Sequence, residues 1–389
     1  MIIVSKVILK ECKNYDLENL VRIINESMEQ LGGWNKYIQS GDKVLLKVNL
    51  IGPKTSESAA ITHSEFVRAL VRILKEKGCT VWIGDSSGGA IAGIAPTAQS
   101  FKVSGYEKVA KEEGAIIKNF DSEGVVEVTA ESNPREKMYL AKPLFDADVV
   151  INLPKLKTHS AGIYTGAVKN LFGCVPGLRK AKYHKMAPDP LDFGHIIVDI
   201  HKATKFSLHI MDGIIAMEGE GPTAGRVYQA NKILISEDPL ALDRVAIDML
   251  GLKIEDVPIL LASQKRGLGE SKLENILIEG DYQEAPKLKN FRLPKRFKTG
   301  KKRNYKVLIK VIDFFKTRPK VNLKNCKGCN VCVESCPMEA IDKDTKKINY
   351  QICIECMCCH ELCMHKAVEL KKDNFLAGIV ANLSLKSHR

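Results

Sequence analysis

A repeated cysteine pattern near the C-terminal end constrains this chain more than any other feature. The first run is Cys326-x2-Cys329-x2-Cys332-x3-Cys336, and a proline follows it. Seventeen residues after that run, the same spacing of four cysteines begins again. Thiolates at this spacing ligate [4Fe–4S] clusters, and the fourth cysteine of each run ligates the cluster held by the other run.

The spacing therefore predicts two [4Fe–4S] clusters. The two predicted ligand sets are Cys326, Cys329, Cys332 and Cys363 for the first cluster, and Cys353, Cys356, Cys359 and Cys336 for the second. Zinc sites more often use two separated pairs of ligands, so eight thiolates in two identical runs fit zinc poorly. The start of the chain has no signal-peptide pattern, and clustered cysteines in a cytoplasmic protein indicate metal binding rather than disulfides.

Across its length, the cysteine module resembles a bacterial-type two-cluster ferredoxin. This resemblance implies one-electron transfer at low potential. The module departs from the pattern at two positions. Met364 stands where a proline is expected after the second run, and Cys358 is an additional thiol beside Cys359. Cys358 is interpreted as a spare thiol that packs in the module, with ligand exchange as the alternative.

Charge and cysteine divide the 389 residues into parts. The whole chain has a net charge of +13, but residues 287–324 alone carry +14, so the remainder is nearly neutral. We expect an α/β domain at 1–285, a basic linker at 286–324, the cluster module at 325–371 and a helical tail at 372–389. No apolar run approaches the ~20 residues that span a membrane, and the chain is expected to be cytoplasmic.

The first 285 residues alternate between strand-like and helix-like patterns. Such alternation predicts an α/β fold class, with a large mixed or parallel sheet followed by the small α+β module of ferredoxin type. Strands are predicted at 2–9, 43–50, 81–83, 115–120, 149–153, 208–211 and 232–235. Helices are predicted at 16–31, from a capping box at Thr62 to Gly78, at 192–203 and at 238–250.

Cationic and amide side chains gather directly after one predicted buried strand. Lys155, Lys157 and His159 alternate there, and Lys169 and Asn170 follow shortly afterwards. Ligands of parallel sheets bind at the carboxyl ends of the strands. These residue types suit a carboxylate, a phosphate or a developing oxyanion, although solvated lysines at a strand end are the simpler interpretation.

The segments NLPKLKTH and TGAVKNLFG resemble the signature of the family catalogued as Domain of Unknown Function 362. The GDSSGG loop at 84–89 and the segments at 211–222 and 238–243 are similar to further stretches of that family. The resemblance covers most of residues 1–285, and fusion to a two-cluster ferredoxin module is common in the family. It favours the five residues above as site candidates and supplies no reaction.

Two carboxylates complete the set of candidate catalytic residues. Asp85 follows a short predicted strand and lies in a turn. Either the amides and hydroxyls of this turn face a ligand, or the segment is simply a glycine turn. Asp212, Glu218 and Glu220 lie in an expected glycine-rich loop, where they suit a general base or a divalent cation. The basic segment 179–185 is expected to be a loop as well. No nucleotide-binding fingerprint accompanies them, which leaves room for an unidentified metal or cofactor in the large domain.

Three functions fit these observations. In the first, an oxidoreductase passes electrons from the module to an anionic small-molecule substrate in the large domain, with a partner protein as donor. In the second, the chain is an electron carrier whose large domain docks a partner reductase through the basic linker. In the third, it is a maturation or cluster-handling protein. The sequence leaves open whether the chain is an enzyme, and a nucleic-acid partner ranks last because no binding fold accompanies the basic linker.

Overall fold

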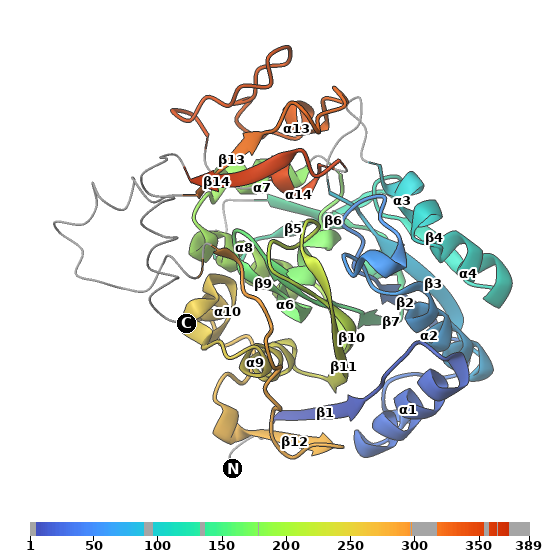
Figure 1. Cartoon of the computed structure of the whole chain (residues 1–389). Coiled ribbons are helices and arrows are strands. Elements are labelled where there is room, and N and C mark those ends of the chain that lie inside the picture. The colour runs from blue at the N-terminus through green and yellow to red at the C-terminus, as the bar shows by residue number, and fades with distance from the viewer. Residues whose placement is uncertain are drawn as a thin grey trace.

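A large twisted sheet forms the centre of the molecule, and the C-terminal residues form a small separate sheet at the top of the view (Figure 1). The computed structural model describes residues 5–88, 96–132, 137–177, 179–295, 297, 317–353, 358–363 and 365–372. The predicted tail helix beyond 372, the part of the basic linker at 298–316, and Cys356 and Met364 lie outside the described residues.

The strands of the large sheet run in the order β12-β1-β11-β10-β7-β2-β3-β4, and β8 pairs with both β10 and β9. Neighbours from β10 through β7, β2 and β3 to β4 are parallel, whereas β11 is antiparallel to β1 and β10. The predicted fold class is therefore confirmed. Its strands are β1 (Ser5–Glu11), β2 (Lys43–Lys47), β3 (Thr80–Asp85), β4 (Ile116–Asn119), β7 (Val149–Asn152), β8 (Lys155–His159), β9 (Ile163–Thr165), β10 (Phe206–Glu218), β11 (Arg226–Ser236) and β12 (Ile276–Gly280).

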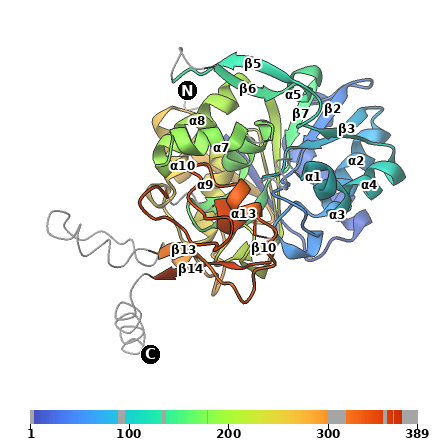
Figure 2. The same cartoon turned by 90° about the horizontal axis from the view of Figure 1, so that it is seen from above.

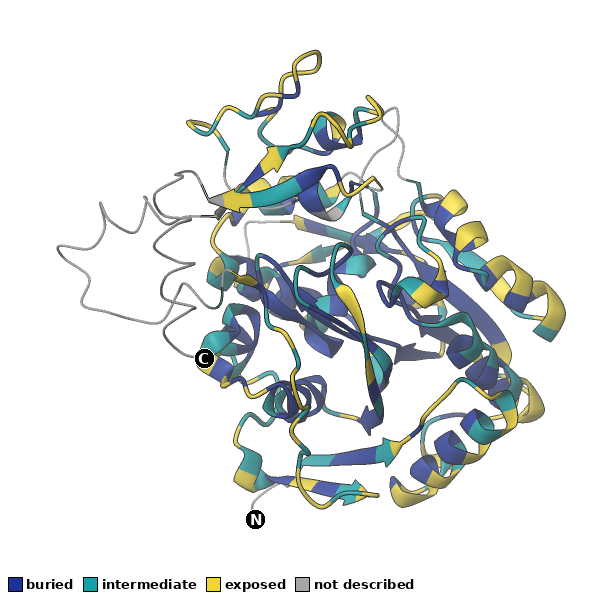
Figure 3. Ribbon diagram, viewed as in Figure 1, coloured by how far each residue is buried: buried dark blue, intermediate teal, exposed yellow. Residues whose placement is uncertain are grey.

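Helices cover both faces of this sheet, as expected when parallel strands are joined by crossovers. Each face of the sheet faces its own apolar core, because alternate residues of a strand point to opposite sides. Ile8 belongs to the core that contains α1 and α2, whereas Val7 and Leu9 belong to the core that contains α8, α9 and α10. Figure 3 shows the central strands of the sheet as mostly buried, whereas the edge strand β4 has no buried residue.

The helices begin and end largely where capping residues predict. Asp16 and Asp238 cap α1 and α9, and each accepts backbone N–H groups of the first turn. The helices of the large domain are α1 (Leu17–Gln30), α2 (Ser64–Glu76), α3 (Thr97–Val103), α4 (Tyr106–Glu113), α5 (Pro143–Asp146), α6 (Ala167–Asn170), α7 (Arg179–Met186), α8 (Pro190–Ala203), α9 (Pro239–Met249) and α10 (Pro258–Lys265).

Three local predictions were wrong. The N-cap of α2 is His63 rather than Thr62, because the Thr62 hydroxyl donates to the Leu153 carbonyl instead. The glycine-rich segment that begins at Asp212 continues strand β10, whereas a loop was expected. The basic segment 179–185, also expected as a loop, forms helix α7.

The C-terminal module contains β13 (Thr317–Val321), α13 (Val331–Glu334), α14 (Cys358–Glu361) and β14 (Val368–Lys372). Strands β13 and β14 pair antiparallel and bring the two ends of the module together. Seen from above, α13 lies over the large domain near α7 (Figure 2). A separate antiparallel hairpin, β5 (Val125–Thr129) and β6 (Lys137–Ala141), extends from the large domain.

The first residues of the basic linker lie on the surface of the large domain. Phe291 packs edge-on against Tyr228, with ring centroids 5.0 Å apart. Glu218 accepts the backbone N–H of Arg292 at 2.8 Å, and Glu220 accepts that of Lys295 at 2.8 Å. Two of the clustered carboxylates that the sequence offered for a cation therefore hold this segment in place.

Candidate functional site

A cavity of about 190 Å³ lies where the large domain meets the C-terminal module. Its walls come from the ends of β2 and β3, from β8 and β9, from the segment α6–α7, and from α13 and α14 of the module. The carboxyl ends of the parallel strands β2 and β3 therefore open into it, where ligands of such sheets bind. An apolar cavity of about 150 Å³ holds benzene, so this one suits a small molecule.

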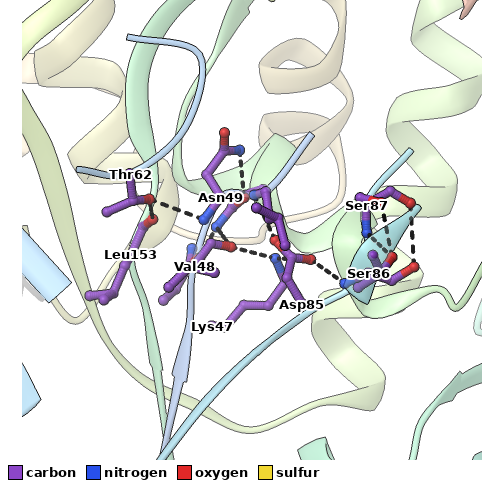
Figure 4. A network of polar contacts seen from close by, with 12 residues as sticks. Lys47, Val48, Asn49, Thr62, Asp85, Ser86, Ser87 and Leu153 are labelled. Carbon is purple, nitrogen blue, oxygen red and sulfur yellow. Dashed lines mark hydrogen bonds and ion pairs between the residues drawn. The ribbon is translucent and has the colours of Figure 1, made fainter. Parts of the chain in front are cut away.

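A buried ion pair holds the strand ends of β2 and β3 together (Figure 4). The Lys47 ammonium lies 3.0 Å from the Asp85 carboxylate, and both side chains are almost inaccessible to solvent. Asp85 also accepts the backbone N–H groups of Leu50 and Ser86, at 2.9 and 2.7 Å. Burial raises the pKa of Asp85, and Lys47 opposes that shift. Asp85 lines the cavity, but these contacts make it an organiser of the two loops.

A chain of amide side chains forms the floor of the cavity. The Lys157 ammonium donates to Asn49 Oδ1 at 2.7 Å and to the Ala60 carbonyl at 2.5 Å. The Asn49 amide donates to Asn170 Oδ1 at 2.8 Å, and Asn170 donates to Asn152 at 2.7 Å. Each amide orients the next, so Lys157 and Asn170 reach the cavity in fixed positions.

Two glycines let helix α6 and the turn after it approach this floor. Asp243 accepts the backbone N–H groups of Ala167 and Val168, at 2.7 and 2.9 Å, and so fixes the start of α6. A Cβ on Gly166 would collide with that carboxylate, and a Cβ on Gly173 would collide with Asp85. These contacts explain the glycines of the segment TGAVKNLFG, and they bring Lys169 to the cavity wall.

Helix α7 contributes a cation on the opposite wall. The Lys180 ammonium donates to Ser86 Oγ at 2.5 Å and to the Ser87 carbonyl at 3.2 Å. Ser86 in turn donates to Asp121 at 2.5 Å. Burial lowers the pKa of Lys180 to about 8, although Asp121 favours the charged form. One turn further along α7, His184 stacks on Phe193 with ring centroids 4.6 Å apart and also lines the cavity.

The module closes the remaining side of the cavity with Glu334, Ser335, Cys358 and Leu362. A Cβ on Gly88 would lie only 3.1 Å from Leu362 Cδ2, so this glycine allows the loop after β3 to touch α14. Cys358 is buried, and it also lines a second, smaller cavity inside the module. The additional thiol noted in the sequence therefore lies between the module's interior and the interdomain cavity.

The structure describes all four cysteines of the first predicted ligand set and three of the second. Burial, and then the charges of the neighbouring thiols of Cys363, Cys326 and Cys329, raise the pKa of Cys332 to about 11. Thiolates that repel one another in this way lie close together. Bound iron would have the opposite effect on their pKa, because it stabilises the deprotonated forms. The three described members of the other set, which are Cys336, Cys353 and Cys359, line the small cavity inside the module.

Backbone N–H groups donate hydrogen bonds to two of these cysteine sulfurs. The N–H of Ala340 donates to Cys336 Sγ at 3.2 Å, and the N–H of Ala367 donates to Cys363 Sγ at 3.1 Å. Both amides stand four residues after their cysteine, so the internal repeat of the sequence is also a repeat of structure. Hydrogen bonds to the sulfurs tune the reduction potential of iron–sulfur clusters.

Two of the predicted site residues lie outside the interdomain cavity. The Lys155 ammonium lies 2.6 Å from the Asp212 carboxylate, and both side chains are fully buried. Asp212 also accepts the Tyr15 hydroxyl at 2.8 Å and the backbone N–H of His63 at 2.9 Å. Burial lowers the pKa of Lys155, and Asp212 opposes that shift. This closed network joins β8 and β10 to the residues before α1 and α2.

His159 also stays away from the cavity. Its Nδ1 accepts the backbone N–H groups of Ala161 and Gly162, at 3.2 and 3.0 Å, and so shapes the turn between β8 and β9.

Cys174 is wholly buried, and burial raises the pKa of its thiol to about 12. Within the described residues, no three His, Cys, Asp or Glu side chains converge closely enough to hold a single metal ion.

Of the predicted candidates, Lys157, Lys169, Asn170 and Asp85 meet at the cavity. Sequence reasoning did not single out Lys180, because helix α7 carries several lysines of similar appearance. Its spacing from His184 by four residues is the signal that would have placed both on one face of a helix.

Comparisons with known proteins identify the family of this chain. The family model described as Domain of unknown function (DUF362) matches residues 44–248, which is more than half of the chain. The chain therefore belongs to this family. A 4Fe-4S binding domain matches residues 319–342. The thylakoid-associated protein sll1697 of Synechocystis is 35% identical over 273 residues, which cover 70% of this chain and 82% of that protein.

Two solved structures align with part of this chain. The lactate racemase apoprotein from Thermoanaerobacterium thermosaccharolyticum aligns with a TM-score of 0.39 and 13% identity over 60% of this chain, and a Thermotoga maritima protein with 0.37 and 14% over 63%. The chain spans 54% and 59% of those two proteins. In the described part of the chain, no helix is both long enough and apolar enough to cross a membrane.

Proposed function

We propose that this protein is an iron–sulfur oxidoreductase that transfers electrons from its C-terminal module to a small anionic substrate in the interdomain cavity. The observation that carries the proposal is the composition of the cavity wall. The large domain contributes Lys157, Lys169 and Lys180, and the module contributes Cys358, which adjoins the predicted cluster ligand Cys359. Cations and a redox module thus meet around one small space.

Charge favours an anion in this space. Lys157, Lys169 and Lys180 line it together with two acids, Asp85 and Glu334, and the ion pair with Lys47 compensates Asp85. An anion that accepts hydrogen bonds from these ammonium groups would gain about 1.5–3 kcal/mol for each charged contact. A small carboxylate or an oxoanion fits both the charge and the volume.

We propose further that both cysteine sets bind a [4Fe–4S] cluster. A cluster of this kind takes up and releases one electron at a time. Cys326, Cys329, Cys332 and Cys363 would hold one cluster, and Cys336, Cys353 and Cys359, with Cys356 as the fourth ligand by spacing, would hold the other. The apolar residues around the second set, including Ile341 and Ile348, would exclude water from it.

An external protein is the proposed electron donor. Cys329 is exposed and Cys326 is partly exposed, so a partner can approach the first set of thiols. The neighbouring Lys324 and Lys327 are exposed as well, and they favour an acidic donor. Such a surface suits an acidic one-electron carrier protein of the cytoplasm as the donor.

The test is the reoxidation of the reduced protein by small anions. Full-length protein with intact clusters is reduced photochemically without oxygen and mixed with a panel of small carboxylates and oxoanions. Recovery of the cluster absorbance is then followed over time. We expect at least one anion to accelerate reoxidation in a saturable manner.

Two lysine variants distinguish this function from a simple electron carrier. In Lys180→Met, half-saturation should shift to a higher anion concentration while iron content stays unchanged. Lys182 lies on the same helix, is exposed and does not line the cavity, so Lys182→Met is the matched control. Reoxidation that no anion in the panel accelerates, or an equal effect of both variants, would contradict the proposed function.

A further inference from the structure

We infer that the second cysteine set, with Cys336, Cys353 and Cys359, is the one that exchanges electrons with the interdomain cavity, and that Cys358 forms the wall between them. The inference rests on the proposed function, because it names the route by which electrons would reach the substrate. It also implies a direction of electron flow through the module, from the electron donor to the first cysteine set and then to the second.

The two cavities share one residue. Cys358 lines the interdomain cavity, where it faces side chains of the large domain such as Phe172 and Lys180. It also lines the small cavity of the module, together with the three described thiols of the second set. Among the described residues, Cys358 is thus the point at which the two spaces adjoin. Electron tunnelling slows exponentially as the distance between two centres increases.

Sequence neighbours of the second set extend this shared wall. Ser335 directly precedes Cys336, and Cys358 directly precedes Cys359, and both Ser335 and Cys358 line the interdomain cavity. Both are also buried, with exposed fractions of 7% and 8%. These two side chains of the shared wall are therefore largely shielded from solvent.

The first set is arranged differently. Cys329 is exposed and the segment 323–325 before Cys326 is exposed as well, so this end of the first set faces outwards, whereas Cys332 and Cys363 are buried. Its fourth member, Cys363, is the one that approaches the large domain. Lys54 lies near Cys363 and Lys366, and its pKa is lowered chiefly by burial. Lys54 does not line the interdomain cavity.

This geometry provides two lysines that report on different clusters. A nearby positive charge stabilises the reduced, more negative form of a cluster, and therefore raises its reduction potential. Lys180 stands in the interdomain cavity, which adjoins the second set through Cys358. Lys54 stands beside the first set. Replacing either lysine with methionine removes one charge and keeps a side chain of similar length.

The experiment is a redox titration of the full-length protein, with each cluster followed by its electron paramagnetic resonance signal. A Cys329→Ser background changes the ligation of the first cluster and assigns the signals. We expect Lys180→Met to lower the potential of the second cluster more than that of the first, and Lys54→Met to do the reverse. Cys358→Ala should retain the iron and sulfide of both clusters.

Each alternative outcome has a separate meaning. A larger effect of Lys180→Met on the first cluster would overturn the inferred route, and it would leave anion-dependent reoxidation untouched. Loss of the second cluster in Cys358→Ala would make Cys358 a ligand, which also overturns the inference. If the potentials respond as expected while no anion reoxidises the protein, the route is supported and the proposed function fails.

Discussion

The ion pair between Lys155 and Asp212 provides a quantitative test of how the large domain is built. Lys155→Met removes an ammonium that lies 2.6 Å from the Asp212 carboxylate, and it leaves this carboxylate buried beside a neutral side chain. Breaking a fully buried pair from one side costs about 3–5 kcal/mol. The Tyr15 hydroxyl and the backbone N–H of His63 still donate to Asp212, so the expected loss is at the lower end, about 3 kcal/mol.

The double variant Lys155→Met/Asp212→Asn isolates the charge itself. The asparagine keeps an oxygen that can accept from Tyr15 or from His63, and no unpaired charge remains. We expect this variant to be less destabilised than the sum of the two single changes, which is the signature of coupled residues. The opposite result, simple additivity, would mean that the two side chains act independently.

Urea unfolding followed by tryptophan fluorescence measures these free energies in the large domain alone. Both tryptophans of the chain, Trp34 and Trp82, lie in that domain and are buried. The exposed Lys182→Met serves as the control, with an expected change within about 0.5 kcal/mol. A loss of less than about 1 kcal/mol in the free energy of unfolding of Lys155→Met would contradict this expectation, because removing the cation from a buried carboxylate costs more than that.

Three further predictions concern the cavity. Lys180→Met should weaken binding of the anion identified in the reoxidation panel by about 10–100-fold, as measured by calorimetry, because one charged hydrogen bond is removed. Burial lowers the pKa of Lys180 to about 8, so its ammonium is neutralised as the pH rises. Anion affinity should accordingly fall as the pH passes upward through 8, whereas retention of full affinity to pH 10 would show that Lys180 does not hold the anion. Gly173→Ala should destabilise the large domain by about 2 kcal/mol or more in urea, because its Cβ meets Asp85 and Lys47, and an unchanged midpoint would contradict that clash.

The sequence predicted the α/β fold class because its signals are local. Asp16 and Asp238 stand at the starts of predicted helices, and their side chains accept backbone N–H groups of the first turn. Thr62 had the same appearance but bonds to Leu153 across the sheet, which no local pattern reveals. The length of β10 was underestimated for a related reason, since Gly213 is typical of a turn and yet lies within a strand.

The candidate site was predicted in part for the same physical reason. Lys155 and Lys157 alternate on strand β8, and both proved to be buried. Their roles differ because of what the fold brings to them: Lys155 meets Asp212 from β10, and Lys157 meets Asn49 after β2. The members of these two pairs lie 57 and 108 positions apart in the sequence. Lys180 reached the cavity only through the packing of α7, which sequence spacing alone does not determine.

A small anion is proposed to bind beside the iron–sulfur module. Electron–nuclear double resonance on the reduced full-length protein tests it directly, with inorganic phosphate and carbon-13-labelled acetate as probes. We predict a coupling between the cluster electron spin and phosphorus or carbon-13, which at a subsaturating probe concentration should weaken in Lys180→Met and be kept in Lys182→Met. Absence of any coupling in the unmodified protein, or a coupling that Lys180→Met leaves unchanged, would contradict it.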